Sequence, residues 1–261
     1  MPEGHTVHRS ARELQPLVGS TVSVSSPQGR FADAEAVDGE VLASVEAYGK
    51  HLLLGFRSGG VVHVHLGMRG VWLRYPPEVA PMRQVRLRLS GPAAAWDLVA
   101  PSTCELLSTD QASALVAGLG PDPLRPGADR SAAVRGLAAS SGAIGAVLLD
   151  QSVIAGVGNV FRAEALHAVG VHPATPASAL DRALLDRLWA ALQRMMAQAV
   201  VDGRIITVDG PDRLTVPESE ARRVYKRSTC KDCGAAVVVG QVGRRTSYHC
   251  PVEQPLAAVS R

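Results

Sequence analysis

The stretch Val61-Val62-His63-Val64-His65-Leu66 places an apolar side chain at every second residue, and Val85-Arg86-Leu87-Arg88-Leu89 repeats the pattern. Successive side chains of a β-strand point to opposite faces, so this alternation predicts strands with one buried face. Further short apolar segments are separated by Gly, Pro or Ser, which is typical of strands joined by turns. We therefore expect an antiparallel β-sandwich after an N-terminal helix at residues 6–18. The other expected strands are residues 41–45, 51–56 and 95–99.

The second half of the chain has a different pattern. Residues 119–127 are dense in Pro and Gly and mark a boundary. Beyond them, apolar residues recur at helical spacing, and the longest such segment has Asp181 near its start and Gly203 beyond its end. The expected helices are residues 131–138, 144–150, 161–169 and 180–200.

Composition narrows the function classes. The 261 residues carry 27 Lys and Arg against 24 Asp and Glu, a net charge of +3. No run of about 18 apolar residues predicts a transmembrane helix, and no basic-then-apolar leader is present, so we expect a cytosolic protein without membrane contact. Residues 222–245 contain seven basic residues and one acid. This local excess indicates a polyanion contact, although a solvated charged face is the ordinary alternative.

The first three residues, Met1-Pro2-Glu3, suggest covalent chemistry. Proline after an initiator methionine favours methionine removal, which would expose Pro2 as a secondary amine. An α-amino group titrates near ~8, so part of it is unprotonated at neutral pH and can form a Schiff base with a carbonyl carbon. Glu3 would then stand beside that nitrogen as a proton shuttle. The alternative is that Pro2 merely follows the start codon.

Three turn residues could contact a nucleic acid. Lys50 follows Gly49 at a strand start and could bind phosphate, although spacing does not separate this from a surface lysine. Met68 lies on a Gly-flanked turn, where an apolar side chain can act as a wedge between DNA base steps or simply pack locally. Asn159 begins a helix after Gly158, and such a helix N-terminus binds phosphate or forms a plain helix corner.

Three cysteines form a candidate metal site. Cys230 and Cys233 make a C-x2-C knuckle, and sixteen residues separate Cys233 from Cys250. In a cytosolic protein this spacing indicates structural zinc. Glu253 stands where a fourth cysteine would complete two knuckles. The fourth ligand could be Glu253 or its neighbour His249, or the site could be weak or empty.

Together these pieces resemble the formamidopyrimidine-DNA glycosylase / endonuclease VIII family, over essentially the whole chain. Each motif is short, and their order and spacing carry the resemblance. The motifs are Met1-Pro2-Glu3-Gly4 with Thr6-Val7-His8-Arg9, Tyr48-Gly49-Lys50, His65-Leu66-Gly67-Met68-Arg69-Gly70, Leu119-Gly120-Pro121-Asp122-Pro123-Leu124, Leu149-Asp150-Gln151 with Ile154-Ala155-Gly156-Val157-Gly158-Asn159, and Cys-x2-Cys-Gly with Gly-Arg-Arg-Thr before Cys250-Pro251.

The resemblance implies a bifunctional DNA glycosylase and AP lyase of base excision repair. Pro2 would attack C1′ of the damaged nucleotide, and Glu3 would protonate the sugar ring oxygen and assist elimination. Met68 would fill the gap left by the extruded base, since the glycosidic bond is unreachable inside the duplex. Lys50 and Asn159 would contact phosphates near the lesion. Arg245, five residues before Cys250, would grip the flipped nucleotide's phosphates from a zinc-finger hairpin.

The branch follows from a missing motif. The formamidopyrimidine branch of the family carries an Arg-Phe-Gly loop, and residues 96–105 lack it. In this respect the chain resembles the endonuclease VIII branch. That resemblance implies that the substrates are oxidised pyrimidines and that the strand is cleaved by β,δ-elimination. We expect an α+β multidomain monomer acting on double-stranded DNA in the cytoplasm, at the nucleoid. A non-catalytic damaged-DNA-binding protein and an RNA-associated zinc-ribbon protein remain alternatives. The expected domains are a catalytic β-sandwich at 1–118, a linker at 119–128, a helix–two-turn–helix domain at 129–220 and a zinc-finger hairpin at 221–261.

Overall fold

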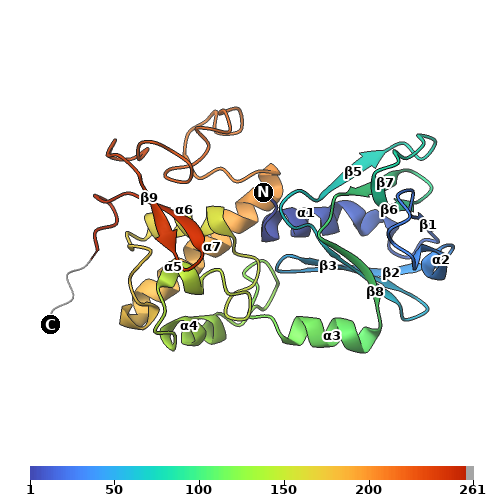
Figure 1. The fold of residues 1–261 in the computed structure, drawn as a ribbon, viewed down its shortest axis with the longest axis horizontal. Helices are drawn as coiled ribbons and strands as arrows, with labels where there is room; N and C mark the ends of the chain where they lie inside the picture. Colours follow the sequence, from blue (N-terminus) through green and yellow to red (C-terminus); the bar gives the residue numbers. More distant parts are fainter. Residues whose placement is uncertain (257–261) are drawn as a thin grey trace. The chain divides into compact units, whose positions relative to one another are not determined.

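The computed structural model describes residues 1–256. Its internal contacts divide the chain into two compact units, Met1–Gly118 and Leu119–Arg261. Each unit has its own apolar core. Figure 1 draws the strands of the first unit and the helices and hairpin of the second as a ribbon. Among the described residues, no helix has the length and apolar character needed to cross a membrane.

Two four-stranded antiparallel sheets build the first unit, which confirms the predicted sandwich. One sheet has the strand order β1-β6-β7-β5 and the other β2-β3-β4-β8. The first sheet comprises β1 (Ser23–Ser25), β6 (Val85–Ser90), β7 (Ala95–Val99) and β5 (Val71–Tyr75). The second comprises β2 (Leu42–Tyr48), β3 (His51–Phe56), β4 (Val61–His65) and β8 (Thr103–Leu107).

Alternating side chains of the two sheets meet in one core. Val62 and Val64 of β4 are fully buried, as are Leu87 and Leu89 of β6. The expected alternation is interrupted at His63 of β4 and Arg88 of β6, whose side chains are also buried. These residues belong to a single apolar cluster drawn from both sheets. The alternation visible in the sequence is therefore the pattern that closes the sandwich.

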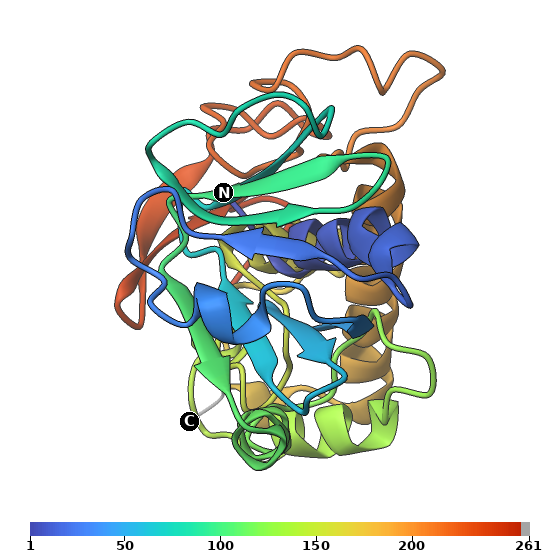
Figure 2. The same cartoon turned by 90° about the vertical axis from the view of Figure 1, so that its right-hand side faces the viewer.

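Helix α1 (Gly4–Leu14) fixes the start of the chain against the second sheet. Its buried residues include Val7 and Leu14, and it packs on β2 and β3 (Figure 2). The α-helix ends before Pro16, because proline lacks the N–H that an α-helix requires. A 3-10 turn, Gln15–Leu17, follows it. The short helix α2 (Ala34–Val37) and the capped helix α3 (Thr109–Ala117) complete the unit.

The second unit contains helices and a hairpin. Helix α7 has the side chain of Asp181 accepting a hydrogen bond at its start and the left-handed Gly203 at its end, as the sequence predicted. A 35-residue stretch without helix or strand, 203–237, separates it from the hairpin. The elements are α4 (Arg130–Ala138), α5 (Ile144–Val147), α6 (Asn159–Ala168), a 3-10 turn (Ala177–Ala179), α7 (Arg182–Asp202), β9 (Val238–Val242) and β10 (Arg245–His249).

One apolar core joins the helices to the cysteine-bearing segment. Cys230 and Cys250 are buried in the same cluster as Phe161 and Leu166 of α6. Residues 119–128 also belong to this unit, because the Gly120 N–H donates to the carbonyl of Gln151 at 2.9 Å. A Cβ at position 120 would lie 2.4 Å from the backbone of Val153, so the close approach requires glycine.

Candidate functional site

The N-terminal residues lie immediately before α1. Met1 is 59 % exposed and Pro2 is half-buried, whereas Glu3 is buried, with only 1 % of its surface exposed. Glu3 has extended backbone geometry and its carbonyl accepts a hydrogen bond from the Thr6 N–H at 2.9 Å. The structure therefore has a buried carboxyl-bearing residue directly after Pro2.

Lys50 lies in the two-residue turn between β2 and β3. Tyr48 pairs with His51 across this turn, and Gly49 takes a left-handed φ of 56°, which such tight hairpin turns require. His51 in turn pairs with His65 at the end of β4. The Lys50 turn therefore lies at the same end of the sheet as the turn that carries Met68.

The histidines of β3 and β4 form a series of contacts that ends at Glu105 of β8. His51 Nδ1 lies 2.9 Å from His63 Nε2, and His63 Nδ1 lies 2.9 Å from Glu105 Oε1. Burial is the main cause that lowers the pKa of His51 to about 4, and the neighbouring charges of His63, His65 and Lys50 add to it. Burial likewise lowers the pKa of His65, followed by the charge of Lys50.

Met68 projects from a turn that the backbone holds tightly. Gly67 has a left-handed φ of 65°, and the Gly70 N–H donates to the Leu66 carbonyl at 2.9 Å. His65 Nδ1 accepts from the Gly67 N–H at 3.1 Å, which ties the turn to β4. Met68 is 69 % exposed and packs in neither apolar core. A rigid turn that presents an apolar side chain to solvent suits a wedge.

In the second unit, Gln151 shapes the loop that leads to Asn159. Its side-chain oxygen accepts from the Gly156 N–H at 3.0 Å, and its nitrogen donates to the carbonyls of Leu149 and Val157 at 3.0 and 3.1 Å. Gly156 has a φ of 90°, which favours glycine there. Asn159 is then the first residue of α6, as its sequence position suggested.

Helix α6 holds the hairpin that carries Arg245. Asn159 Nδ2 donates to the Thr246 carbonyl at 3.1 Å, and the fully buried Arg162 donates to the same carbonyl at 2.5 Å and to the Gly145 carbonyl at 3.2 Å. Arg245, which precedes Thr246, is exposed at the start of β10 after the Gly243-Arg244 turn. Asn159 and Arg162 thus share the backbone carbonyl of Thr246, the residue that follows Arg245 in β10.

Glu164 of α6 organises the irregular stretch after α7. Its carboxylate is fully buried and accepts from the backbone N–H groups of Arg223, Val224 and Tyr225 at 2.8, 3.0 and 2.7 Å, and from the Thr207 hydroxyl. Sequence reasoning missed both Arg162 and Glu164. The available signal was a pair of charged residues in an otherwise apolar helix.

The three cysteines form the ligand cluster that their spacing predicted. Their sulfurs all lie within 4.8 Å of one another, and Cys233 Sγ is 3.4 Å from Cys250 Sγ. Zinc–sulfur bonds of 2.3 Å in a tetrahedron separate sulfurs by about 3.8 Å, so the cluster fits one ion. Glu253 contributes its backbone N–H to Cys250 Sγ at 3.4 Å while its side chain is exposed. His249 Nε2 lies 3.1 Å from His172 Nε2.

Comparison with known proteins identifies relatives over nearly the whole chain. Residues 1–101 match the family model described as the formamidopyrimidine-DNA glycosylase N-terminal domain, and residues 119–209 match the formamidopyrimidine-DNA glycosylase H2TH domain. Endonuclease 8 1 of Mycobacterium tuberculosis is 41 % identical over 269 residues, covering 97 % of this chain and 100 % of that protein. The formamidopyrimidine-DNA glycosylase of Shewanella loihica is 31 % identical, covering 92 % of each.

Solved structures agree on the fold. The Lactococcus lactis formamidopyrimidine-DNA glycosylase, crystallised with DNA containing N7-benzyl-Fapy-dG, superposes with a TM-score of 0.80, at 22 % identity, covering 98 % of this chain and all of that one. The same enzyme bound to DNA with an abasic site gives a TM-score of 0.79. Since both predicted halves are matched in order, and one relative exceeds 40 % identity along nearly the whole chain, this protein belongs to the formamidopyrimidine-DNA glycosylase / endonuclease VIII family.

Proposed function

We propose that this protein is a DNA glycosylase of base excision repair that also cleaves the strand at the resulting abasic site. One observation carries the proposal: a buried carboxylate, Glu3, directly follows Pro2 in a chain 41 % identical to a protein named endonuclease 8. Removal of the exposed Met1 would convert the Pro2 nitrogen from an amide into a nucleophilic secondary amine.

The chemistry follows from these two residues. The Pro2 nitrogen attacks C1′ of the nucleotide, and the bond from C1′ to the damaged base breaks, so the base leaves with a proton. Glu3 protonates the ring oxygen as the sugar opens, which gives an iminium ion on Pro2. Loss of a C2′ proton then expels the 3′ phosphate, a second elimination expels the 5′ phosphate, and water releases the sugar remnant from Pro2.

The remaining site residues would hold the DNA. Lys50 would bind a phosphate beside the lesion, and Asn159 and Arg245 would bind the phosphates of the extruded nucleotide. Met68 would occupy the gap in the base stack, because an extruded base leaves its neighbours unstacked. The exposure of Met68 and Arg245 supports these roles.

Oxidised pyrimidines are the substrates we favour. Only Ala100, Pro101 and Ser102 connect β7 to β8, and Ala100 has a strained φ of 49°. Such a short connection supports our interpretation that the Arg-Phe-Gly loop is absent. It therefore also supports our placing the protein in the endonuclease VIII branch. We further propose that the protein is a monomer and works in the cytoplasm at the nucleoid, which light scattering and a fluorescent fusion would check.

The metal at the cysteine cluster is, in our proposal, a structural zinc ion. Cys230, Cys233 and Cys250 would hold it as thiolates. The sequence offers Glu253 or His249 for the fourth position, and the structure adds His167, which contacts Cys230. Zinc would supply no reacting group and would stabilise the fold of the finger.

A borohydride trap tests the catalytic proposal. Protein mixed with abasic-site DNA and borohydride should form a covalent complex, and a tryptic digest should carry the sugar remnant on the peptide of residues 2–9 that begins at Pro2. Intact Met1 in active protein, or a remnant on another peptide, would exclude Pro2. Binding without any product would instead support the non-catalytic alternative.

A matched pair of variants tests Glu3. Glu3→Gln should lower base excision by about 10²–10⁴-fold, because general acid catalysis is typically worth that much. Glu13→Gln is the control, since Glu13 lies in α1 but is exposed and pairs with Arg9 at 2.9 Å. Equal activity of the two variants would remove Glu3 from the mechanism.

A further inference from the structure

The cysteine cluster has three thiols, whereas structural zinc sites bind four protein ligands. Neither fourth ligand that the sequence offers lies within 4.8 Å of all three sulfurs. The Glu253 side chain is exposed, and its contact with the cluster is made by its backbone N–H. His249 Nε2 faces His172, with the two rings edge to face and 4.3 Å between their centroids. The fourth donor should therefore come from elsewhere in the second unit.

His167, in the last turn of α6, faces the cluster from the helix side. Its Nε2 lies 3.3 Å from Cys230 Sγ, and its side chain is 3 % exposed. A ligand sulfur and a ligand nitrogen on one tetrahedral zinc ion are separated by about 3.6 Å, so this contact already has the spacing of two ligands. The imidazole is not within 4.8 Å of all three sulfurs. A side-chain rotation around a bound ion would bring it inward.

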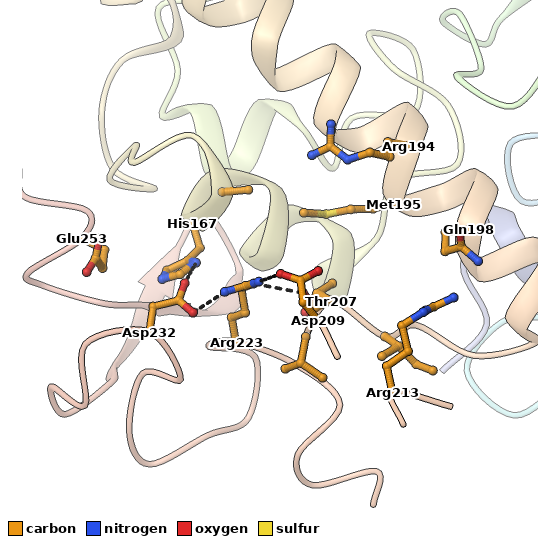
Figure 3. A pocket seen from close by; sticks show the side chains of 13 residues that line it. His167, Arg194, Met195, Gln198, Thr207, Asp209, Arg213, Arg223, Asp232 and Glu253 are labelled. Carbon is orange, nitrogen blue, oxygen red and sulfur yellow. Dashed lines mark hydrogen bonds and ion pairs between the residues drawn. The ribbon is translucent and has the colours of Figure 1, made fainter. Parts of the chain in front are cut away.

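The other ring nitrogen of His167 faces a carboxylate. Nδ1 lies 3.8 Å from Asp232 Oδ2 and makes no hydrogen bond to the described residues (Figure 3). A neutral imidazole has one N–H and one lone pair. With the proton on Nδ1 toward Asp232, the Nε2 lone pair points at Cys230, which is the carboxylate–histidine–metal arrangement that orients metal-bound histidines.

Asp232 is itself held in place. The Arg223 guanidinium bridges Asp232 and Asp209 through ion pairs, and its Nε donates to the Thr207 carbonyl at 3.0 Å (Figure 3). Arg223 thus fixes the carboxylate that faces His167. The chain of contacts runs from the irregular stretch after α7 to the thiol of Cys230.

We propose that His167 is the fourth ligand of the metal bound by Cys230, Cys233 and Cys250, and that Asp232 positions its imidazole. This inference rests on the proposed zinc site. The metal would then join the C-terminal end of α6 to the finger, while Asn159 and Arg162 join the N-terminal part of the same helix to Thr246. The helix and the hairpin would be tied at two places, which would fix the strand that begins at Arg245.

Zinc K-edge X-ray absorption of the full chain, loaded with zinc and with its zinc content measured, tests the ligand set. The expected result is three sulfurs and one nitrogen, with the outer-shell scattering of one imidazole. That scattering should vanish in His167→Gln and persist in His249→Gln and Glu253→Gln. His167→Cys should keep one zinc ion and raise the sulfur number to four, and it decides the question should His167→Gln fail to fold.

The outcomes separate the two proposals. A wild-type chain that binds no zinc overturns the zinc site, and the ligand proposal with it. Zinc bound by three sulfurs and an oxygen, or imidazole scattering lost in His249→Gln instead, overturns His167 alone and leaves the zinc site standing. In that case His167 is an N–H donor to the Cys230 sulfur.

Asp232→Asn tests the positioning role separately. Competition with a chelator should show a 10- to 100-fold loss of zinc affinity with the sulfur and nitrogen numbers unchanged, as for other partners of metal-bound histidines. Asp212→Asn, in the same irregular stretch, is the control. Equal affinities of the Asp232 variant and the wild type would exclude the role of Asp232.

Discussion

In the strands of the first unit, backbone N–H and carbonyl groups form hydrogen bonds within the sheets. A buried ion pair there joins the side chains of Arg88 and Asp97 on neighbouring strands. The second unit has 35 residues without helix or strand after α7, and two buried charged side chains of α6 bind backbone groups of other segments. Glu164 accepts three backbone N–H groups, and Arg162 donates to two carbonyls. In the second unit, therefore, side chains of α6 replace the hydrogen bonds that a sheet would provide.

This difference shows how each unit positions its functional residues. Lys50 and Met68 occupy turns whose places follow from strand register. By contrast, the hairpin that carries Arg245 and the cysteine cluster are both in contact with α6. These contacts join residues 87 and 63 positions apart in the chain. A buried polar group left without a partner costs about 1–3 kcal/mol, and more when charged, so the second unit is sensitive to single polar substitutions.

Metal removal should separate the two units most strongly. Structural zinc sites contribute about 10 kcal/mol or more of binding free energy, so a strong chelator should lower the unfolding temperature of the second unit by at least about 10 °C. Hydrogen exchange should show lost protection at Cys230, Cys250 and the end of α6, with the sandwich unchanged. Added zinc should restore protection and magnesium should not. An equal loss of hydrogen-exchange protection in both units would contradict the inference that the metal stabilises the second unit alone.

Glu164→Gln should have the next largest effect. The amide replaces one acceptor oxygen by N–H donors that face other donors, so we expect a loss of about 3–5 kcal/mol in the free energy of unfolding of the second unit. Chemical denaturation followed by hydrogen exchange would measure it, with exchange concentrated at residues 207 and 223–225. Glu105→Gln, at a half-exposed carboxylate of the sandwich, is the control and should cost under about 1 kcal/mol.

Sequence patterns predicted the two units unequally. Alternation identified β3, β4, β6, β7 and most of β2 but missed β1, β5 and β8. The missed strands all lie at sheet edges, where one flank lacks a neighbouring strand and burial alternates weakly, as the pattern of β8 shows. The long connection 203–237 has no periodicity that would reveal its contacts.

Part of the candidate site was also within reach of the sequence. Pro2 and Glu3 are adjacent, and Cys230, Cys233 and Cys250 follow a known ligand spacing, so their proximity could be predicted. His167 could not be, because its contact with Cys230 spans 63 residues and depends on how α6 packs. For the same reason the sequence favoured Glu253 and His249, which are near Cys250 in the chain.

Arg88→Met tests whether buried charges in the sandwich are replaceable. Burial raises the pKa of Asp97 and Arg88 opposes it, so the variant leaves a buried carboxyl without its cation and should cost about 3 kcal/mol. The double variant Arg88→Met, Asp97→Leu should recover most of this loss in denaturant titrations, because it removes both charges of the buried pair. No recovery would show that the Arg88 hydrogen bond to the Val79 carbonyl, at 2.6 Å, dominates.

The smallest expected effect concerns acid stability of the sandwich. Burial, followed by the charges of His63, His65 and Lys50, lowers the pKa of His51 to about 4, whereas an unfolded histidine titrates near ~6.5. Between these values the unfolded chain binds more protons, so the free energy of unfolding should fall as pH drops from about 6.5 to 4.

Because His51 is partly exposed, screening reduces the expected contribution to roughly 1 kcal/mol. His51→Gln should flatten this part of the pH profile and leave stability at pH 7.5 nearly unchanged, as measured by hydrogen exchange of β3 and β4. His249→Gln is the control, because burial also lowers the pKa of that histidine but in the second unit. The opposite result would contradict the separate stabilisation of the two units: His249→Gln would change the pH profile of the sandwich and His51→Gln would not.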